Sequence, residues 1–129
     1  MDEQQKQQND MVVIFSYTRE QAIADGVLVD VSQTSEAREA GFAIPIVLTA
    51  GVHGLVQVPE ELKGQQDYKG RLWDTLFLAA SAFRRYPEDK HLVPFKVVYQ
   101  TGAKTAELVD LWLCFNEYEG FTILRPEEY

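Results

Sequence analysis

The sequence predicts a single α+β domain, and three observations carry that prediction. Residues 68–86 repeat apolar side chains at the spacing of an amphipathic helix. The C-terminal third alternates apolar and polar residues with the period of two that strands show. Short runs of both kinds follow one another over residues 11–56. Helices and strands that occupy separate stretches of one chain are typical of the α+β class.

Length and charge exclude some classes of protein. The 129 residues suit one domain, and 46% apolar with 25% charged residues is ordinary for a soluble globular protein. The formal charge is −8, but residues 1–10 and 117–129 contribute −2 and −3, which leaves −3 for the rest. Residues 11–116 are thus mildly acidic and offer no broad basic face for phosphates, so we expect no general nucleic-acid binding.

The chain has no sequence signature of export or membrane insertion. Residues 1–10 are glutamine-rich and acidic, unlike a signal peptide, so we predict a disordered leader before a single domain over residues 11–129. No apolar run approaches the roughly 20 residues that span a bilayer. Cys114 is the only cysteine, which excludes an intrachain disulfide. We therefore expect a cytoplasmic protein without membrane contact.

The N-terminal half is predicted to begin with a strand and a capped helix. An apolar, β-branched run over residues 11–15 indicates the strand. Thr18 and Gln21 have the spacing of a capping box, in which each side chain bonds the backbone amide of the other residue. Gly26 offers a left-handed stop. We expect a helix over residues 19–25 between these signals.

Further short elements follow. Residues 27–31 alternate valines as a strand does, and residues 32–42 combine hydroxyl caps, alanines and a terminal glycine, which predicts a second short helix. Residues 44–48 form an apolar run. Residues 49–58 fit a helix or a strand, because their two glycines cost a helix about 1 kcal/mol each.

The strongest predicted helix covers residues 68–86, after a polar loop over residues 59–67. Pro87 ends it, and two arginines in its last turn complement the helix dipole. Its expected core-facing stripe consists of Leu72, Trp73, Leu76, Phe77, Ala80 and Phe83.

The C-terminal third is predicted to be a three-stranded antiparallel meander. Strands are expected over residues 93–100, 105–116 and 121–125. Residues 101–104 have the composition of a hairpin turn between the first two.

Four residues are candidates for ligand binding in a cleft: Tyr17, Arg19, His53 and Arg71. His53 stands between two glycines, and its ring suits proton transfer, but a lone histidine in an apolar run also fits simple packing. Arg71 either pairs with Asp74, three residues further along the helix, or holds an anionic ligand beside Trp73.

Trp112 is the candidate interaction residue. It lies on the predicted strand face opposite a fully apolar face, so it is either covered by helices or exposed as a partner surface. Cys114, on the same face, has no histidine near it in sequence and fits a buried apolar group better than a nucleophile.

The sequence contains no familiar motif for a metal or a cofactor. It lacks the glycine loops that cradle phosphates and the paired cysteines of zinc sites. The two histidines, His53 and His91, and the single cysteine are far apart. We expect no metal and no cofactor.

Three blocks of sequence carry a resemblance. The segments over residues 16–31, 37–42 and 70–74 together resemble a family of small bacterial proteins of unknown function that are encoded on plasmids, phages and integrated elements. The resemblance covers residues 12–125. It implies an accessory role in a mobile element and no particular catalytic residue.

The start of the chain also resembles ADP-ribosyltransferase-like proteins. In those proteins a strand ends in His-Tyr-Thr, and a helix, a glycine and a second strand follow. Tyr17-Thr18 and Gly26-Val27-Leu28 fit this outline. Ser16 occupies the position of the histidine that holds the nicotinamide cofactor there.

Two functional hypotheses follow from the sequence. The first is a non-catalytic protein-interaction module whose partner is a host protein or one encoded by the element, with a homodimer as a further option. The second is a divergent ADP-ribosyltransferase-like enzyme that binds a nucleotide.

Overall fold

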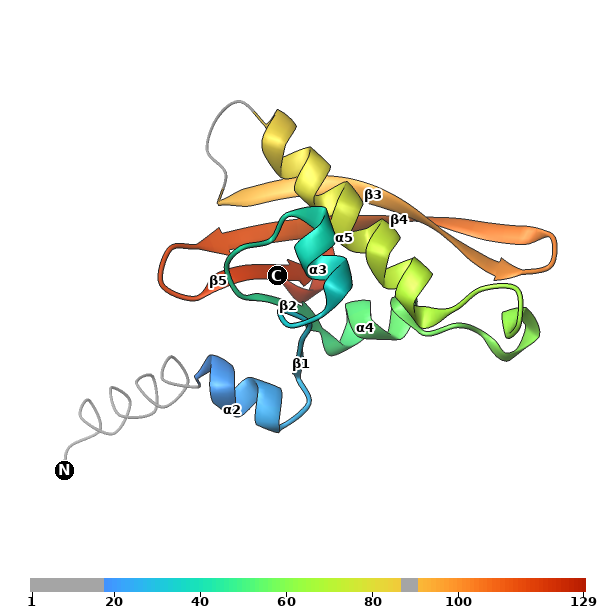
Figure 1. Ribbon diagram of the computed structural model, residues 1–129, viewed down its shortest axis with the longest axis horizontal. Helices are drawn as coiled ribbons and strands as arrows, with labels where there is room; N and C mark the ends of the chain where they lie inside the picture. The colour runs from blue at the N-terminus through green and yellow to red at the C-terminus, as the bar shows by residue number, and fades with distance from the viewer. Residues whose placement is uncertain (1–17, 87–90) are drawn as a thin grey trace.

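The computed structural model describes residues 18–86 and 91–129, and these form an α+β domain around one mixed sheet (Figure 1). The predicted leader over residues 1–10 and the predicted strand over residues 11–15 lie outside the described residues. The helices and strands follow one another as α2 (Arg19–Ala24), β1 (Leu28–Asp30), α3 (Ser35–Ala40), β2 (Ile46–Thr49), α4 (Ala50–Val56), η1 (Glu60–Leu62), α5 (Tyr68–Arg85), β3 (Leu92–Gly102), β4 (Thr105–Asn116), β5 (Gly120–Leu124) and η2 (Pro126–Glu128).

The short helices begin and end at their sequence signals. Thr18 Oγ1 accepts the Gln21 amide at 3.0 Å, and Gln21 Oε1 accepts the Thr18 amide at 2.9 Å, which confirms the capping box. Helix α3 ends at Gly41 with φ 98°. The hydroxyl of Thr49, the last residue of β2, caps the first turn of α4. Most of the ambiguous stretch over residues 49–58 is therefore a helix despite its glycines.

The sheet has five strands in the order β1-β2-β5-β4-β3. Strands β3, β4 and β5 pair antiparallel in sequence, as expected. The prediction of a three-stranded meander was incomplete, because β2 pairs parallel with β5 and β1 pairs antiparallel with β2. The two halves of the chain therefore share one sheet. Its edge strands are β3, with 11 residues, and β1, with three.

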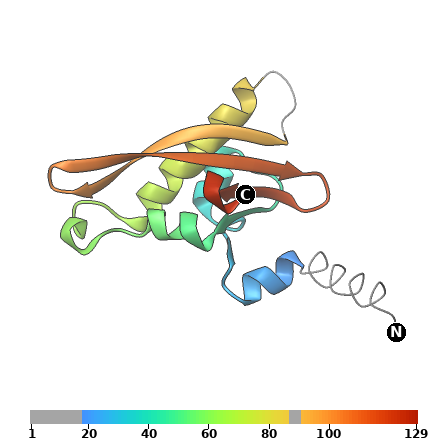
Figure 2. The ribbon, with the colours of Figure 1, turned by 180° about the vertical axis from the view of Figure 1, so that it is seen from behind.

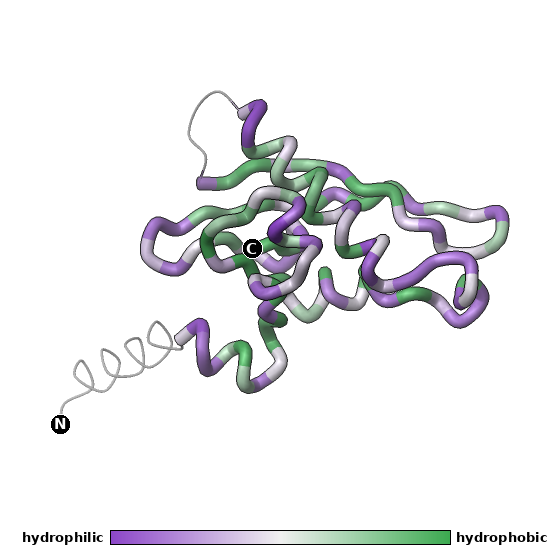
Figure 3. The backbone as a smooth tube through the Cα atoms, viewed as in Figure 1, coloured by the Kyte–Doolittle hydropathy of each residue, from purple (hydrophilic) through white to green (hydrophobic). Residues whose placement is uncertain are grey.

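The core lies on one face of the sheet. Helices α3, α4 and α5 cover that face (Figure 1), and the turn η2 lies on the opposite face (Figure 2). Figure 3 shows the hydrophobic colour where α5 crosses β3 and β4, and the hydrophilic colour on the loop before α5. The largest fully buried side chains include Ile46, Leu48, Leu72, Leu76, Leu111, Leu113 and Ile123.

Helix α5 turns part of the predicted stripe to the core, including Phe83, which is partly buried against it. Leu72, Leu76 and Ala80 are buried as expected, but Trp73 and Phe77 are 36% and 40% exposed and stack on each other with ring centroids 4.8 Å apart. The reason is that the buried arc is rotated toward β3 and includes Arg71, Thr75, Ala79 and Ala82. Neither α5 nor any other described helix is long and apolar enough to cross a membrane.

Gly120 makes the junction between the two halves of the sheet possible. It is the first residue of β5 and has φ 100°, and a Cβ there would lie 2.3 Å from the carbonyl oxygen of Pro45. The same oxygen accepts the Phe121 amide at 2.8 Å, beside the parallel pairing of β2 with β5. Only glycine allows this close approach at a positive φ.

We predict that Gly120→Ala lowers the free energy of unfolding by about 2 kcal/mol or more, measured by urea denaturation, because the new Cβ meets the Pro45 oxygen in a strained backbone conformation. Gly54→Ala is the control: its Cβ meets nothing within 4 Å, and alanine stabilises a helix by about 0.5–1 kcal/mol relative to glycine. A Gly120→Ala protein as stable as the wild type would contradict this account of the junction.

Candidate functional site

The side chain of Arg71 is the centre of the candidate site. It is only 8% exposed, and its guanidinium donates to three segments outside α5. Nε and Nη2 donate to the Leu55 carbonyl in the last turn of α4, at 3.3 and 2.9 Å. Nη1 donates to Gln66 Oε1 at 2.8 Å and to the Gln100 carbonyl of β3 at 2.9 Å. The guanidinium carbon also lies 5.2 Å from the centroid of the Tyr99 ring.

The predicted pairing of Arg71 with Asp74 is wrong. No carboxylate of a described residue lies within 4.0 Å of the guanidinium, and all its acceptors are neutral. Arg71 points inward because the last carbonyls of α4 and the edge of β3 offer acceptors there. Burial lowers the pKa of Arg71, but a guanidinium is basic enough to stay charged at neutral pH.

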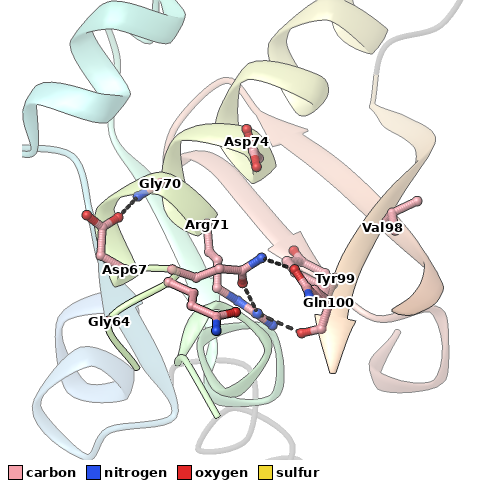
Figure 4. Close-up of a pocket in the computed structure, with 10 residues that line it drawn as sticks. Gly64, Asp67, Gly70, Arg71, Asp74, Val98, Tyr99 and Gln100 are labelled. Carbon is pink, nitrogen blue, oxygen red and sulfur yellow. Dashed lines mark hydrogen bonds between the residues drawn. The ribbon is translucent and has the colours of Figure 1, made fainter. Parts of the chain in front are cut away.

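A pocket of about 540 Å³ opens beside this guanidinium, and we call it the Arg71 pocket. It lies between the loop before α5, the first turns of α5 and the outer part of β3 (Figure 4). Its size is in the range of pockets that hold a small molecule or a few side chains. Its lining consists of Gly64, Gln65, Gln66, Asp67, Gly70, Arg71, Asp74, Val98, Tyr99 and Gln100.

The chemistry of the Arg71 pocket is that of binding through hydrogen bonds and charge. Burial raises the pKa of Tyr99 although Thr75 bonds its hydroxyl at 2.6 Å, so the phenol is neutral at physiological pH. Burial also raises the pKa of Asp74. The lining contains amides, two carboxylates, a phenol and one guanidinium, and no serine, cysteine, lysine or histidine. This set suits recognition of a polar group better than nucleophilic chemistry.

Two hydrogen bonds establish which backbone groups of β3 face outward. The His91 carbonyl accepts the amide of Phe115 on β4, so the backbone of His91 points toward β4. The Gln100 carbonyl instead accepts from Arg71, on the side away from β4. The backbone N–H and C=O groups of successive residues point to opposite sides of a strand. The backbone groups of residues 93, 95, 97 and 99 therefore bond to β4, and those of residues 94, 96, 98 and 100 point away from it.

The outward groups of the second half of β3 are unpaired within the described part of the chain. No described residue bonds the backbone N–H or C=O of Lys96 and Val98, or the N–H of Gln100. We call these groups the β3 edge. The side chain of Val98 and its cross-strand partner Leu108 are 61% and 59% exposed. The β3 edge thus borders both the Arg71 pocket and an exposed apolar pair.

The structure does not bring the three described binding candidates, Arg19, His53 and Arg71, into one cleft. Tyr17, and with it Ser16, lies outside the described residues. Arg19 donates to Thr122 Oγ1 at 3.0 Å and to the Phe121 carbonyl, which fastens α2 to β5. His53 packs edge-on against the ring of Tyr68, and its Nε2 lies 3.3 Å from the Tyr68 hydroxyl. Only Arg71 lines the pocket.

The position of Trp112 matches neither predicted alternative, cover by helices or exposure as a partner surface. It lies on the sheet face opposite the helices, so helices do not cover it, and it is half-buried against the ring of Tyr129, with centroids 5.3 Å apart. Its cover therefore comes from the C-terminus, where Tyr129 directly follows the turn η2, and not from helices. Cys114 is half-buried on the same face, and burial raises the pKa of its thiol, so the reactive thiolate is disfavoured at neutral pH.

Sequence reasoning missed four residues that complete the site: Gln66, Val98, Tyr99 and Gln100. The alternation over residues 93–100 puts Tyr99 and Val98 on opposite faces of the strand, and in the structure Tyr99 is buried and Val98 is exposed. What the sequence did not reveal is that β3 is an edge strand. Pro94 was the available signal, because a proline inside a sheet is confined to edge positions with its nitrogen outward.

Comparisons with known proteins add no assignment. No protein-family model, no curated protein and no solved structure matches the chain. In the part of the chain that the structure describes, no three His, Cys, Asp or Glu residues converge as metal ligands. The site must therefore be interpreted from its own geometry.

We predict that Arg71→Lys lowers the free energy of unfolding by roughly 2–4 kcal/mol, measured by urea or thermal denaturation. A lysine cannot reach the carbonyls of Leu55 and Gln100 together, so at least one of these acceptors is left without its donor. Arg85→Lys is the control, because Arg85 is exposed and its one hydrogen bond to a described residue goes to the Ser81 carbonyl of its own helix. Equal stability of the two variants would show that Arg71 does not join the three segments.

Proposed function

We propose that this chain is a protein-interaction module that binds an extended segment of a partner protein along the β3 edge. The observation that carries the proposal is the row of unpaired backbone groups at Lys96, Val98 and Gln100, next to an open pocket. An exposed edge of this kind is a template for one more strand. Backbone hydrogen bonds supply affinity in such complexes, and pockets for alternate side chains supply specificity.

The first and second halves of β3 differ in how they are protected. Pro94 has no N–H and points outward, so it blocks pairing near the start of the strand. Lys96 keeps its N–H, and its side chain lies 3.5 Å from Asp110 of β4 on the exposed face. Val98 has an apolar, exposed side chain, and both its backbone N–H and its C=O point outward. The segment from Lys96 to Gln100 is therefore the part of the edge that accepts a strand.

A segment of another protein fits this edge better than a second copy of the chain. Two β3 strands paired antiparallel about Val98 would bring two copies of α5 to one axis, since Asp74 of α5 and Val98 line the same pocket. The two Asp74 carboxylates would then repel each other in a place where burial already raises the pKa of Asp74. A single extended segment carries no helix into that space.

The mobile-element role implied by the sequence resemblance is part of the same proposal. A small module that binds an extended segment suits an accessory protein, whose partner is encoded by the element or by its host. The partner is then recognised by strand-forming sequence and by the side chain that enters the Arg71 pocket.

We predict that Val98→Pro weakens binding at least tenfold while the fold persists. The substitution removes one outward N–H and no bond to β4, as Pro94 already does in the same strand. The probe is a phage-displayed library of random nine-residue peptides, panned on the wild-type protein, with affinities of enriched peptides measured by interferometry. Val98→Thr, which keeps the N–H, is the matched control and should retain binding.

Two results would count against this proposal. If the wild type enriches no peptide relative to Val98→Pro, the β3 edge does not bind an extended segment. If light scattering shows a wild-type dimer that Val98→Pro abolishes, the occupant is a second copy and the partner assigned above is wrong.

A further inference from the structure

The register of an added strand determines which of its side chains enters the Arg71 pocket. Residues directly opposite each other in a sheet place their side chains on the same face. A residue opposite Val98 therefore lies on the exposed face, beside Val98 and Leu108. The next residue lies opposite Tyr99, whose side chain is buried on the helix side against Thr75. Its side chain points to the helix side, where the Arg71 pocket opens.

Arg71 gives this pocket a positive group that is not neutralised nearby. A guanidinium has five N–H donors, and Arg71 makes four hydrogen bonds to described residues, all to neutral oxygens. One Nη2 hydrogen has no acceptor among the described residues. Within residues 18–86 and 91–129, the only side chain that bonds the guanidinium is Gln66, whose Oε1 lies 2.8 Å from Nη1. An incoming carboxylate can bond Nη2 and share or take the place of this amide oxygen.

The two carboxylates that line the pocket do not supply the missing partner. Asp67 accepts the Gly70 amide at 2.7 Å and thereby caps the first turn of α5. Asp74 lies further along α5, apart from the guanidinium, as Figure 4 shows. The lining as a whole carries two carboxylates and one guanidinium, but the guanidinium itself is bonded to neutral acceptors among the described residues, two of them from Gln66 and Gln100.

We propose that the Arg71 pocket selects an aspartate or glutamate side chain on the strand bound at the β3 edge. This inference rests on the proposed function and specifies the chemistry of its partner. A carboxylate forms charge-assisted hydrogen bonds with the guanidinium, about twice as strong as those of a neutral amide. A lysine at the same position meets the buried positive charge of Arg71, and an apolar side chain leaves the pocket's polar groups unpaired.

The test uses three synthetic peptide pools that differ in one fixed residue. Each pool consists of nine-residue peptides randomised among Val, Ile, Thr and Tyr, with Glu, Gln or Lys fixed at the centre and both ends blocked. Affinities for the wild-type protein are measured by interferometry at low salt. We expect the Glu pool to bind at least tenfold more tightly than the Gln pool, and the Lys pool to bind least.

Two variants show whether the preference comes from contact with Arg71. Gln66→Glu places a carboxylate next to Nη1 at nearly unchanged geometry and so neutralises the guanidinium. The affinity of the Glu peptide pool divided by that of the Gln pool should then fall to about one. Gln33→Glu is the matched control: it makes the same change of side chain and of net charge at an exposed residue that does not line the Arg71 pocket. It should keep most of the preference.

The outcomes separate this inference from the proposed function. If Glu and Gln pools bind equally and Val98→Pro abolishes both, the chain binds strands at the β3 edge, but Arg71 does not select a carboxylate. If Gln33→Glu removes the preference as fully as Gln66→Glu, the preference comes from the protein's net charge and the inference is wrong. If no pool binds, the proposed function fails and the inference fails with it.

Discussion

The buried guanidinium of Arg71 is the interaction on which the candidate site depends. One side chain from the second turn of α5 bonds the end of α4, the loop before α5 and the outward carbonyl of Gln100. Hydrogen bonds to a charged group are stronger than neutral ones, and leaving their buried acceptors unpaired is costly. Arg71 therefore ties α5 to β3 and to α4 at the place where the pocket opens.

The same arrangement leaves the β3 edge open. Of the outward backbone groups in the second half of β3, Arg71 bonds the carbonyl of Gln100. The N–H and C=O groups of Lys96 and Val98 have no partner among the described residues and lie next to the pocket. Pro94 protects the first half of the strand, whereas the other sheet edge is a strand of only three residues. Within the described sheet, the unprotected length of edge thus coincides with the pocket and with the exposed pair of Val98 and Leu108. A long open edge is a liability for a folded protein unless another strand uses it.

Much of the fold is local in origin and was predictable for that reason. The capping box at Thr18 and Gln21, the glycine stop at Gly41 and the alternation of residues 93–100 depend only on neighbours in sequence. Pairing of β2 with β5 joins segments more than 70 residues apart, and no local pattern encodes it. The inward turn of Arg71 was missed because its acceptors are backbone carbonyls, which every sequence contains. The same long-range packing rotates α5 so that Trp73 and Phe77 stay exposed.

Amide hydrogen exchange of the free protein, resolved by residue along β3, tests the open edge most directly. We expect alternating protection: the amides of Val97 and Tyr99, which bond to β4, exchange slowly, and those of Lys96 and Val98 exchange far faster. Measurement at low protein concentration keeps self-association out of the result. Equal, strong protection of all four amides would show that the edge is already covered, and it would contradict binding of a partner strand there.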